Sequence, residues 1–516
     1  MLRDPVPGLA FAYDLQTMYL VVIGILSLIL AFTGPPFRWG LMDRGWIFAA
    51  VAAATLIPPG IAWLLARRAL KLLDRNIADP SIGQYAFGRG MVIIQTVLGV
   101  SHAAIISMTN WLNICEQVPV VGKWFVIPGF LAALPFLVSI LLIWIVNYPA
   151  DRAIRQIAVE TFLFRGRPAR PVWELPRYLL FNLRHQVLFI FVPMLLILLA
   201  RDAVVRYDKQ IREWTGQNSM PDLLLGASAL IVAVIAPSIL RRIWVTQPLP
   251  EGPLRDRLLH LCSKLKMRCR EILIWHSGGM IVNAAVMGVI APFRYFLITD
   301  AMLEQLEDRH IEAVFGHEAG HVKKHHIFFF LLFAFISGCL VTSLSERGRG
   351  MNHFTYQVAI AVVAGFLMFK WGVLFGWISR AFERQADLYG VRTLAASGLP
   401  CQLPCAVHPS ADNPGPAAQP ANDAAICQTA AHLFGDTLDQ VAVLNGIPTH
   451  ARSWRHGSIS LRNRTLIRYA SDTEAVFHFE RRVARIKLGI ALAALVSGLL
   501  AAWDLKLWTL LGIHAI

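Results

Sequence analysis

Two histidines and a glutamate near the middle of the chain have the spacing of a hydrolytic metal site. Residues 311–326 read IEAVFGHEAGHVKKHH, in which His317 and His321 are four residues apart. On an α-helix such side chains project from one face about 6 Å from each other, so that two imidazoles can bind one metal ion. Glu318 is turned toward the side where a metal-bound water would lie. The pattern predicts His317 and His321 as zinc ligands and Glu318 as the general base.

A hydrolytic zinc also needs a third protein ligand and an open coordination position. Residues 379–390 read SRAFERQADLYG, in which Glu383 and Asp387 are four apart and share a helical face. Two apolar segments separate them from the histidines, and two membrane crossings return a chain to the side it left. We therefore expect Glu383 to be the third ligand. Asp387 would accept the outer N–H of a ligand histidine and so set its tautomer.

Simpler interpretations exist for each motif taken alone. His317 and His321 fit a charged helix surface, and Glu383 and Asp387 fit a solvated helix face; their joint occurrence favours the metal site. A di-iron membrane hydroxylase is disfavoured, because such sites need several histidine clusters whereas the other histidines stand mostly singly. A catalytically silent scaffold or chaperone is disfavoured by the presence of Glu318.

The composition places this site in a membrane protein. Of the 516 residues, 56% are hydrophobic and only 16% are charged, which is too apolar for an ordinary soluble enzyme of this size. The net charge of +15 would suggest nucleic-acid binding in a soluble protein. Here the Lys and Arg residues cluster in short loops between apolar runs, so we expect a lipid bilayer as partner and no nucleic acid.

Nine apolar segments are long enough, or nearly so, to span a membrane. They lie at 17–33, 46–66, 91–112, 124–146, 180–200, 223–240, 327–344, 357–378 and 488–503. Basic clusters at 67–89, 152–177, 241–242 and 481–487 all fall on one side of this arrangement, which the positive-inside rule makes cytoplasmic. The fold class predicted is therefore mainly α, a polytopic helical membrane protein whose metalloprotease domain faces the cytoplasm.

The same segments predict the domain organisation. Residues 1–240 would form about six N-terminal transmembrane helices. Residues 241–487 would form the metallopeptidase domain, interrupted by a transmembrane hairpin at 327–378 and a Pro-rich flexible insertion at 400–425. Residues 488–516 would hold the last membrane helix. Short β-rich runs at 272–276, 281–288 and 294–299 predict a small antiparallel sheet.

The seven cysteines are odd in number and lack the paired CxxC spacing of a zinc ribbon. We assign them no disulfide framework.

The motifs together resemble one family. HEAGH, an intervening membrane hairpin and ERQAD look like the HExxH/ExxxD pattern of the HtpX-like and CAAX prenyl protease family of membrane gluzincins. Asn283-Ala284 with Gly288 resembles the NAxxxG strand of that family, and His326 falls where the family often has a further histidine. Residues 456–462 resemble its HPxxxxR motif, with Gly457 in place of proline. The resemblance covers about 265–487; the N-terminal helices carry no motif that aligns.

The resemblance implies further roles. Asn283, Ala284 and Gly288 would lie on an edge strand that pairs with an extended peptide, although an ordinary strand is the alternative. His456 would donate to the oxyanion of the tetrahedral intermediate, but Gly457 departs from the pattern and a surface histidine is the competing interpretation. Arg462 would anchor either Asp387 or the fold.

These observations predict a zinc endopeptidase with one Zn²⁺ per chain, acting on membrane-associated, misfolded or lipid-anchored proteins. No Pro or Gly occurs between His321 and Ile336, so the zinc helix would run straight into the membrane, with His325 and His326 as interfacial residues. The composition fits a bacterial inner membrane, with the endoplasmic reticulum as the alternative. The sequence indicates neither the natural substrate nor the oligomeric state.

Overall fold

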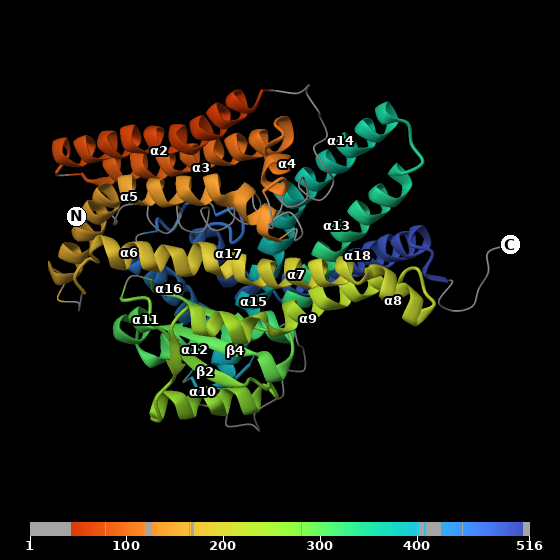
Figure 1. Ribbon diagram of the computed structural model, residues 1–516. Coiled ribbons are helices and arrows are strands. Elements are labelled where there is room, and N and C mark those ends of the chain that lie inside the picture. Colours follow the sequence, from red (N-terminus) through yellow and green to blue (C-terminus); the bar gives the residue numbers. More distant parts are fainter. Residues whose placement is uncertain are drawn as a thin grey trace. The chain divides into compact units, whose positions relative to one another are not determined.

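The computed structural model describes residues 43–508 except 78, 119–125, 165, 167–169, 280, 400, 402–406, 409–424, 446 and 452. Its contacts divide the chain into two units, Met1–Trp244 and Val245–Ile516. Each unit is described by itself below (Figure 1).

Eight helices of the described residues are long and apolar enough to cross a membrane. They are Arg44–Arg75, Ile82–Ile106, Val126–Ile157, Leu175–Arg206, Met220–Ile243, His326–Gly348, His353–Ala396 and Thr473–Asp504. Each overlaps one segment expected from the sequence, and the prediction of a polytopic helical membrane protein is confirmed. The first expected segment, at 17–33, lies outside the described residues, as does most of the insertion at 400–425.

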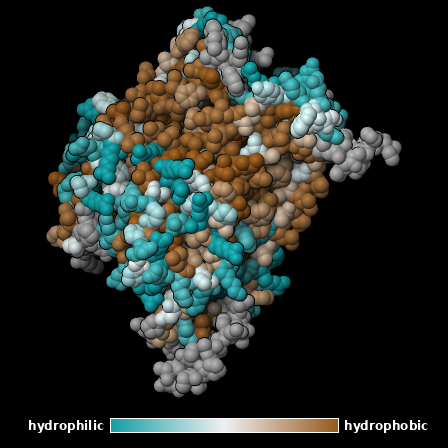
Figure 2. Space-filling view, turned by 60° about the horizontal axis from the view of Figure 1, so that its bottom comes forward, coloured by the Kyte–Doolittle hydropathy of each residue, from teal (hydrophilic) through white to brown (hydrophobic). Residues whose placement is uncertain are grey.

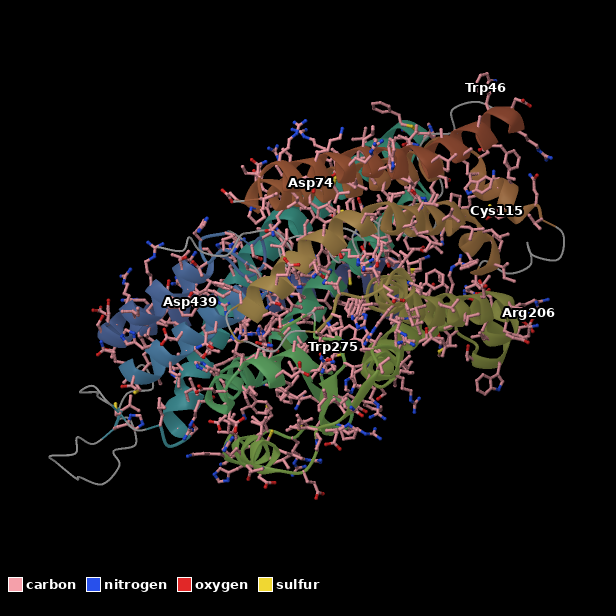
Figure 3. All side chains as sticks on the ribbon, turned by 90° about the vertical axis from the view of Figure 1, so that its left-hand side faces the viewer. Trp46, Asp74, Cys115, Arg206, Trp275 and Asp439 are labelled. Carbon is pink, nitrogen blue, oxygen red and sulfur yellow. The ribbon has the colours of Figure 1, made fainter. Side chains whose placement is uncertain are left out.

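The described part of the first unit is helical. Its elements are α2 (Arg44–Arg75), α3 (Ser81–Met108), α4 (Trp111–Glu116), α5 (Val126–Phe164), α6 (Leu175–Asn182), the π-helix η1 (Leu183–Leu188), α7 (Phe189–Arg206), α8 (Asp208–Thr215) and α9 (Met220–Ile243). Helix α2 packs against α3 and α5, and Figure 3 shows Trp46 and Asp74 toward its two ends. Ala62, Ala66 and Ala69 of α2 are buried. Their small side chains let neighbouring membrane helices approach closely.

The described residues of the second unit form a small sheet and nine α-helices. Its strands are β1 (Thr246–Pro248), β2 (Glu271–Trp275), β3 (Ala284–Met287) and β4 (Tyr295–Thr299), with the 3₁₀ turn η2 (Ala291–Phe293) before β4. Its helices are α10 (Pro253–Lys264), α11 (Asp300–Gln305), α12 (Asp308–Lys323), α13 (His326–Gly348), α14 (His353–Phe369), the π-helix η3 (Lys370–Leu374), α15 (Phe375–Ala396), α16 (Gln428–Leu444), α17 (Ile459–Ser471) and α18 (Thr473–Asp504).

The sheet is mixed, with strand order β1-β2-β4-β3. The expectation of an antiparallel sheet is therefore wrong for one pairing, because β2 runs parallel to β4. The physical reason lies in the loop after β2. The carboxylate of Asp300 accepts hydrogen bonds of 3.0 Å from the backbone N–H groups of Ser277 and Gly278, and both Gly278 and Gly279 have positive φ. This anchored loop carries the chain past β4, so that β3 pairs with the far side of β4 as an edge strand.

The zinc helix does not continue straight into the membrane, contrary to the sequence expectation. Helix α12 ends at Lys323 and α13 begins at His326, with His325 between them at φ +58°. A non-glycine residue in this conformation is uncommon and has no breaker signature in the sequence. The turn directs His326 into the protein, where it is fully buried and its ring stacks on Phe382 with centroids 4.4 Å apart.

The membrane hairpin returns as one long helix. Helix α14 passes through the π-turn η3 directly into α15, so the segment that carries Glu383 is continuous with a membrane-spanning helix. At the π-turn, buried Lys370 donates to the carbonyl oxygen of Phe333 and, at 2.7 Å, to the hydroxyl of Ser337, both on α13. These bonds hold the two arms of the hairpin together at membrane depth, where unpaired polar groups are costly. Helix α13 also packs along α18 (Figure 1).

The surface fits a bilayer environment. Large apolar side chains are exposed along the candidate spans; Leu64, Phe328, Val362 and Leu499 are each more than two-fifths exposed. Figure 2 shows broad apolar areas on the face it draws, next to hydrophilic ones. Contiguous apolar surface of this extent is typical of contact with lipid or with a partner.

The basic loops predict the sidedness of the second unit, and cysteine labelling tests it. Arg349 in the α13–α14 turn and Glu474 at the start of α18 have side chains 74% and 83% exposed. We expect Arg349→Cys to react with a membrane-impermeant maleimide in intact cells, and Glu474→Cys only after lysis, in each case above the labelling of the parent chain. The reverse result would place the metal site on the outer side.

Candidate metal centre

The site forms where α12 and α15 cross at very short distance. A Cβ atom at Gly320 would lie 3.0 Å from the Cα of Ala386, and one at Gly390 would lie 3.1 Å from the backbone nitrogen of His317. Gly316 is similarly close to Gly390 and Thr393. Small residues spaced four apart on both helices therefore permit the backbones to approach. This contact brings the α12 histidines to the α15 carboxylate.

The three expected ligands lie together. Nε2 of His317 is 3.3 Å from Nε2 of His321. Oε2 of Glu383 lies 3.5 Å from Nε2 of His317, and Oε1 of Glu383 lies 3.7 Å from Nε2 of His321. Ligand atoms about 2.0–2.2 Å from a tetrahedral zinc are roughly 3.3–3.6 Å apart. All three side chains are mostly buried, yet the histidines keep 12% and 15% of their surface exposed. The donor set and its spacing therefore fit zinc with access from one side.

Asp387 lies behind His317. Its Oδ1 lies 2.9 Å from Nδ1 of His317, although this contact is not well aligned for a hydrogen bond. The guanidinium of Arg462 donates two hydrogen bonds to the same carboxylate. Its Nε donates to Oδ2 at 2.8 Å, and its Nη2 donates to Oδ1. Arg462 thus contacts Asp387, and its Nη2 also lies 3.9 Å from Glu383. A carboxylate behind Nδ1 favours the tautomer that leaves Nε2 free for a metal.

A second relay, which sequence reasoning missed, supports His321. Its Nδ1 lies 3.0 Å from Nδ1 of His326, whose Nε2 lies 2.9 Å from Oε1 of Gln385. Gln385 is oriented by Lys487, which donates to its Oε1 at 2.8 Å, and by Glu480, which accepts from its Nε2. The amide oxygen of Gln385 requires an N–H at Nε2 of His326. Nδ1 of His326 is therefore unprotonated and accepts a hydrogen bond from Nδ1–H of His321.

The interfacial interpretation of His326 is therefore wrong, because the turn at His325 buries it. The family resemblance at this position was the one signal in the sequence that pointed to it.

Glu318 is positioned beside the ligands. Burial, with repulsion from Glu383 as a smaller cause, raises the pKa of Glu318 to about 7 despite the opposing effect of His317. Its Oε2 accepts a hydrogen bond of 3.1 Å from the backbone N–H of Val286 in β3. A carboxyl group with a pKa near neutral is suited to take up and release a proton at physiological pH.

The charges of the site favour a bound cation. Burial lowers the pKa of His321 to about 3, which leaves its lone pair available. Burial also acts to lower the pKa of His317, but Asp387 and Glu383 outweigh it and raise that pKa to about 10. Two buried carboxylates thus hold a proton at His317, where a metal ion would provide the same compensation. The pKa of Arg462 is raised, because the Coulombic and hydrogen-bonding effects of Asp387 exceed the cost of burial.

His456 lies at the site, on the segment before α17. Its Nδ1 is 3.0 Å from Oε2 of Glu383, and its side chain is 32% exposed. The histidine therefore contacts the expected third ligand and is itself partly exposed. A role in binding the oxyanion stays a prediction.

The expected substrate strand is the edge strand of the sheet. Ala284 pairs with Ile298 of β4, while the opposite edge faces α12, where Val286 meets Glu318. Asn283 precedes the strand, and its side-chain oxygen accepts from the N–H of Ala284. Gly288 has φ +97°, and a Cβ there would lie 2.1 Å from the carbonyl oxygen of Phe293. Gly288 is thus required by the turn after β3, whatever its part in substrate binding.

A cavity of about 200 Å³ opens beside His321. Gly288 and Val289 line it on one side, and Ile327 and Phe328, the first apolar residues of α13, line it on another. Basic side chains complete the wall: Lys266, Arg268, Arg294 and Lys323. The metal centre is therefore next to a space bounded by both apolar and cationic groups.

Comparison with known proteins agrees with this geometry. A sequence model of peptidase family M48 matches residues 248–419, about a third of the chain, and this range contains His317, Glu318, His321 and Glu383. Residues 248–419 are thus similar to the peptidase domain of family M48. His456 and Arg462 lie beyond the matched range of the M48 domain.

The chain is also similar to the protein named CAAX prenyl protease 1 homolog from Arabidopsis thaliana. The two are 30% identical over an alignment of 171 residues that covers 30% of this chain. The chain spans 39% of the length of that relative. A crystal structure of S. mikatae Ste24p aligns with 83% of this chain and 100% of its own, at 12% identity and a TM-score of 0.47, a likeness too weak to support an assignment by itself.

The relay behind His321 predicts that His326 positions the metal ligand. We expect His326→Ala to weaken zinc binding by about 10–100-fold, because His321 loses the acceptor that sets its tautomer. Competition with a fluorescent chelator in detergent measures the change. The exposed neighbour provides the control: His325→Asn tolerates the left-handed backbone and should leave the affinity unchanged. Equal affinity in the parent chain and His326→Ala would contradict the positioning role.

Proposed function

We propose that this chain is a membrane-embedded zinc-dependent endopeptidase. The observation that carries the proposal is the convergence of His317, His321 and Glu383, with donor atoms all within 4.8 Å of one another, beside the carboxyl group of Glu318. The M48 match over the same residues supports a metallopeptidase, and the eight apolar helices support a membrane location.

Each side chain of the site has a separate role in the proposed peptide hydrolysis. His317, His321 and Glu383 would hold the zinc, which when bound polarises the scissile carbonyl and activates a water molecule. Glu318 takes the proton of that water and passes it to the leaving amine, so that no covalent enzyme intermediate is needed. Asp387 and His326 keep the two imidazoles in the tautomers that expose Nε2. His456, whose side chain is partly exposed beside Glu383, would donate to the oxyanion.

Strand β3 supports the binding of an extended peptide. It is the edge strand of the sheet and lies against α12, so a substrate segment added alongside it would pass close to Glu318. Asn283 and Ala284 stand at its beginning, and Gly288 forms the turn at its end. Main-chain hydrogen bonds along such an edge hold a peptide without requiring one particular sequence.

Membrane-associated proteins are the proposed substrates. The cavity beside His321 is lined by Ile327 and Phe328, where α13 starts, and the helix that carries Glu383 is continuous with a membrane helix. The zinc would thus lie close to the membrane surface, within reach of misfolded membrane segments or lipid-anchored chains. The name of the Arabidopsis relative makes prenylated proteins one class to examine. The bacterial inner membrane and a cytoplasmic active site belong to the same proposal.

Replacing the general base tests the proposed chemistry. We expect Glu318→Gln to retain zinc and to lose proteolysis by at least about 100-fold, since a positioned base contributes about 10²–10⁴-fold. His317→Ala should lose activity together with the zinc held by His321 and Glu383. Metal content and cleavage of a quenched fluorescent peptide in detergent are measured on the same samples. Undiminished cleavage by Glu318→Gln would rule out the mechanism, and absence of cleavage by the parent chain on any substrate would favour a scaffold.

The substrate class has its own test. In liposomes we expect a peptide tethered to the bilayer by a lipid chain to be cleaved at least about tenfold faster than the same peptide free in solution, because tethering raises its effective concentration at the site. The Glu318→Gln variant gives the background rate. Equal cleavage of the tethered peptide and of soluble casein would remove the support for membrane substrates.

A further inference from the structure

A second group of metal-binding side chains lies beyond the C-terminal end of α15. One ligand atom each from Cys401, His408 and Cys427 lies within 4.8 Å of the others. Among the described residues, this group and the His317–His321–Glu383 site are the two sets of at least three His, Cys, Asp or Glu side chains that meet this condition. The mechanism proposed above uses none of the three residues.

The group is partly buried. Cys427 immediately precedes α16 and is 1% exposed, within the main hydrophobic core of the unit. Cys401 packs against the same core. Nε2 of His408 lies 3.0 Å from the carbonyl oxygen of Ala395, near the end of α15. With Nε2–H donating to that oxygen, the lone pair of the imidazole is at Nδ1, an arrangement usual for a histidine that binds a metal.

The sulfur atoms have the separation expected for two ligands of one ion. Their distance is 3.6 Å, and thiolates about 2.3 Å from a tetrahedral zinc lie roughly 3.7 Å apart. A disulfide would bring them to about 2.05 Å and would not need the imidazole. Two thiols and one imidazole form a donor set that prefers zinc or another thiophilic ion to Mg²⁺ or Ca²⁺.

We propose that Cys401, His408 and Cys427 bind a second, structural metal ion, with Zn²⁺ as the expected occupant. Binding releases the thiol protons to solvent, and the ion ties the end of α15 to the start of α16 across the chain between residues 408 and 427. The content expected from the sequence, one zinc per chain, then becomes two. The proposal does not depend on the peptidase activity.

The proposed metal ion would lie at the start of α16, a helix that packs against the two helices of the peptidase site. Helix α16 packs against α12 and α15, and His310 of α12 lies 2.7 Å from the hydroxyl of Thr437 on α16. Phe434 of α16 occupies the space at Gly390, with its ring 6.2 Å from that of His317. A metal at the start of α16 therefore stabilises a helix that covers the peptidase site without supplying a residue to it.

The test is the metal content of the full-length chain in detergent, measured by mass spectrometry of the elements under reducing conditions. We expect about two ions in the parent chain, one in Cys401→Ser/Cys427→Ser, one in His317→Ala/His321→Ala, and none when all four changes are combined. Cys262 and Cys269 serve as the matched control, because their sulfur atoms lie 4.0 Å apart and, among the described residues, belong to no group of three potential ligands. Replacing both by serine should leave two ions. Cys405 lies outside the described residues and stays unchanged in every variant.

Cobalt substitution keeps the test decisive if the cysteine variant folds poorly. Co²⁺ bound by thiolates has a ligand-to-metal charge-transfer absorption that histidine and carboxylate ligands do not produce. We expect it in the parent chain and in His317→Ala/His321→Ala, in both cases titrating with one Co²⁺ per chain. Three outcomes would each overturn the proposal. They are absence of this absorption in folded His317→Ala/His321→Ala, an unchanged metal content in Cys401→Ser/Cys427→Ser, and a Cys401–Cys427 disulfide that persists under reducing conditions.

Discussion

The close crossing of α12 and α15 is the constraint on which the metal centre depends. Backbone contact at Gly320 and Gly390 is possible because neither position carries a Cβ atom. Without this approach the carboxylate of Glu383 would not come within 3.7 Å of both imidazoles. The membrane hairpin between the two helices makes the crossing possible, since α14 and α15 form one helix that returns to the level of α12.

A different part of the chain positions each of the two imidazoles through side-chain contacts at Nδ1. Arg462 from α17 fixes Asp387, which faces His317, whereas Lys487 and Glu480 from α18 fix Gln385 and thereby His326 and His321. The C-terminal helices thus complete a site whose ligands all lie upstream. Buried polar chains of this kind rigidify a structure when every member has a partner.

The two clusters of candidate metal ligands lie at different points along the chain of α15. Glu383, in the first half of α15, faces partly exposed histidines, which leaves one side open for a substrate. In the group beyond its end, Cys427 belongs to the hydrophobic core and Cys401 packs against that core. This group shares no residue with the His317–His321–Glu383 site.

Local patterns in the sequence indicated the candidate ligands and most of the architecture. Helical spacing places His317 and His321 on one face, as it does Glu383 and Asp387, and the apolar runs locate the eight described spans. Three features depended on contacts between distant residues. Asp300 anchors the loop that makes β2 parallel to β4, the turn at His325 turns His326 inward against Phe382, and core packing brings Cys401 to Cys427. Periodicity records which face of an element is apolar, but only tertiary packing decides which partner that face meets.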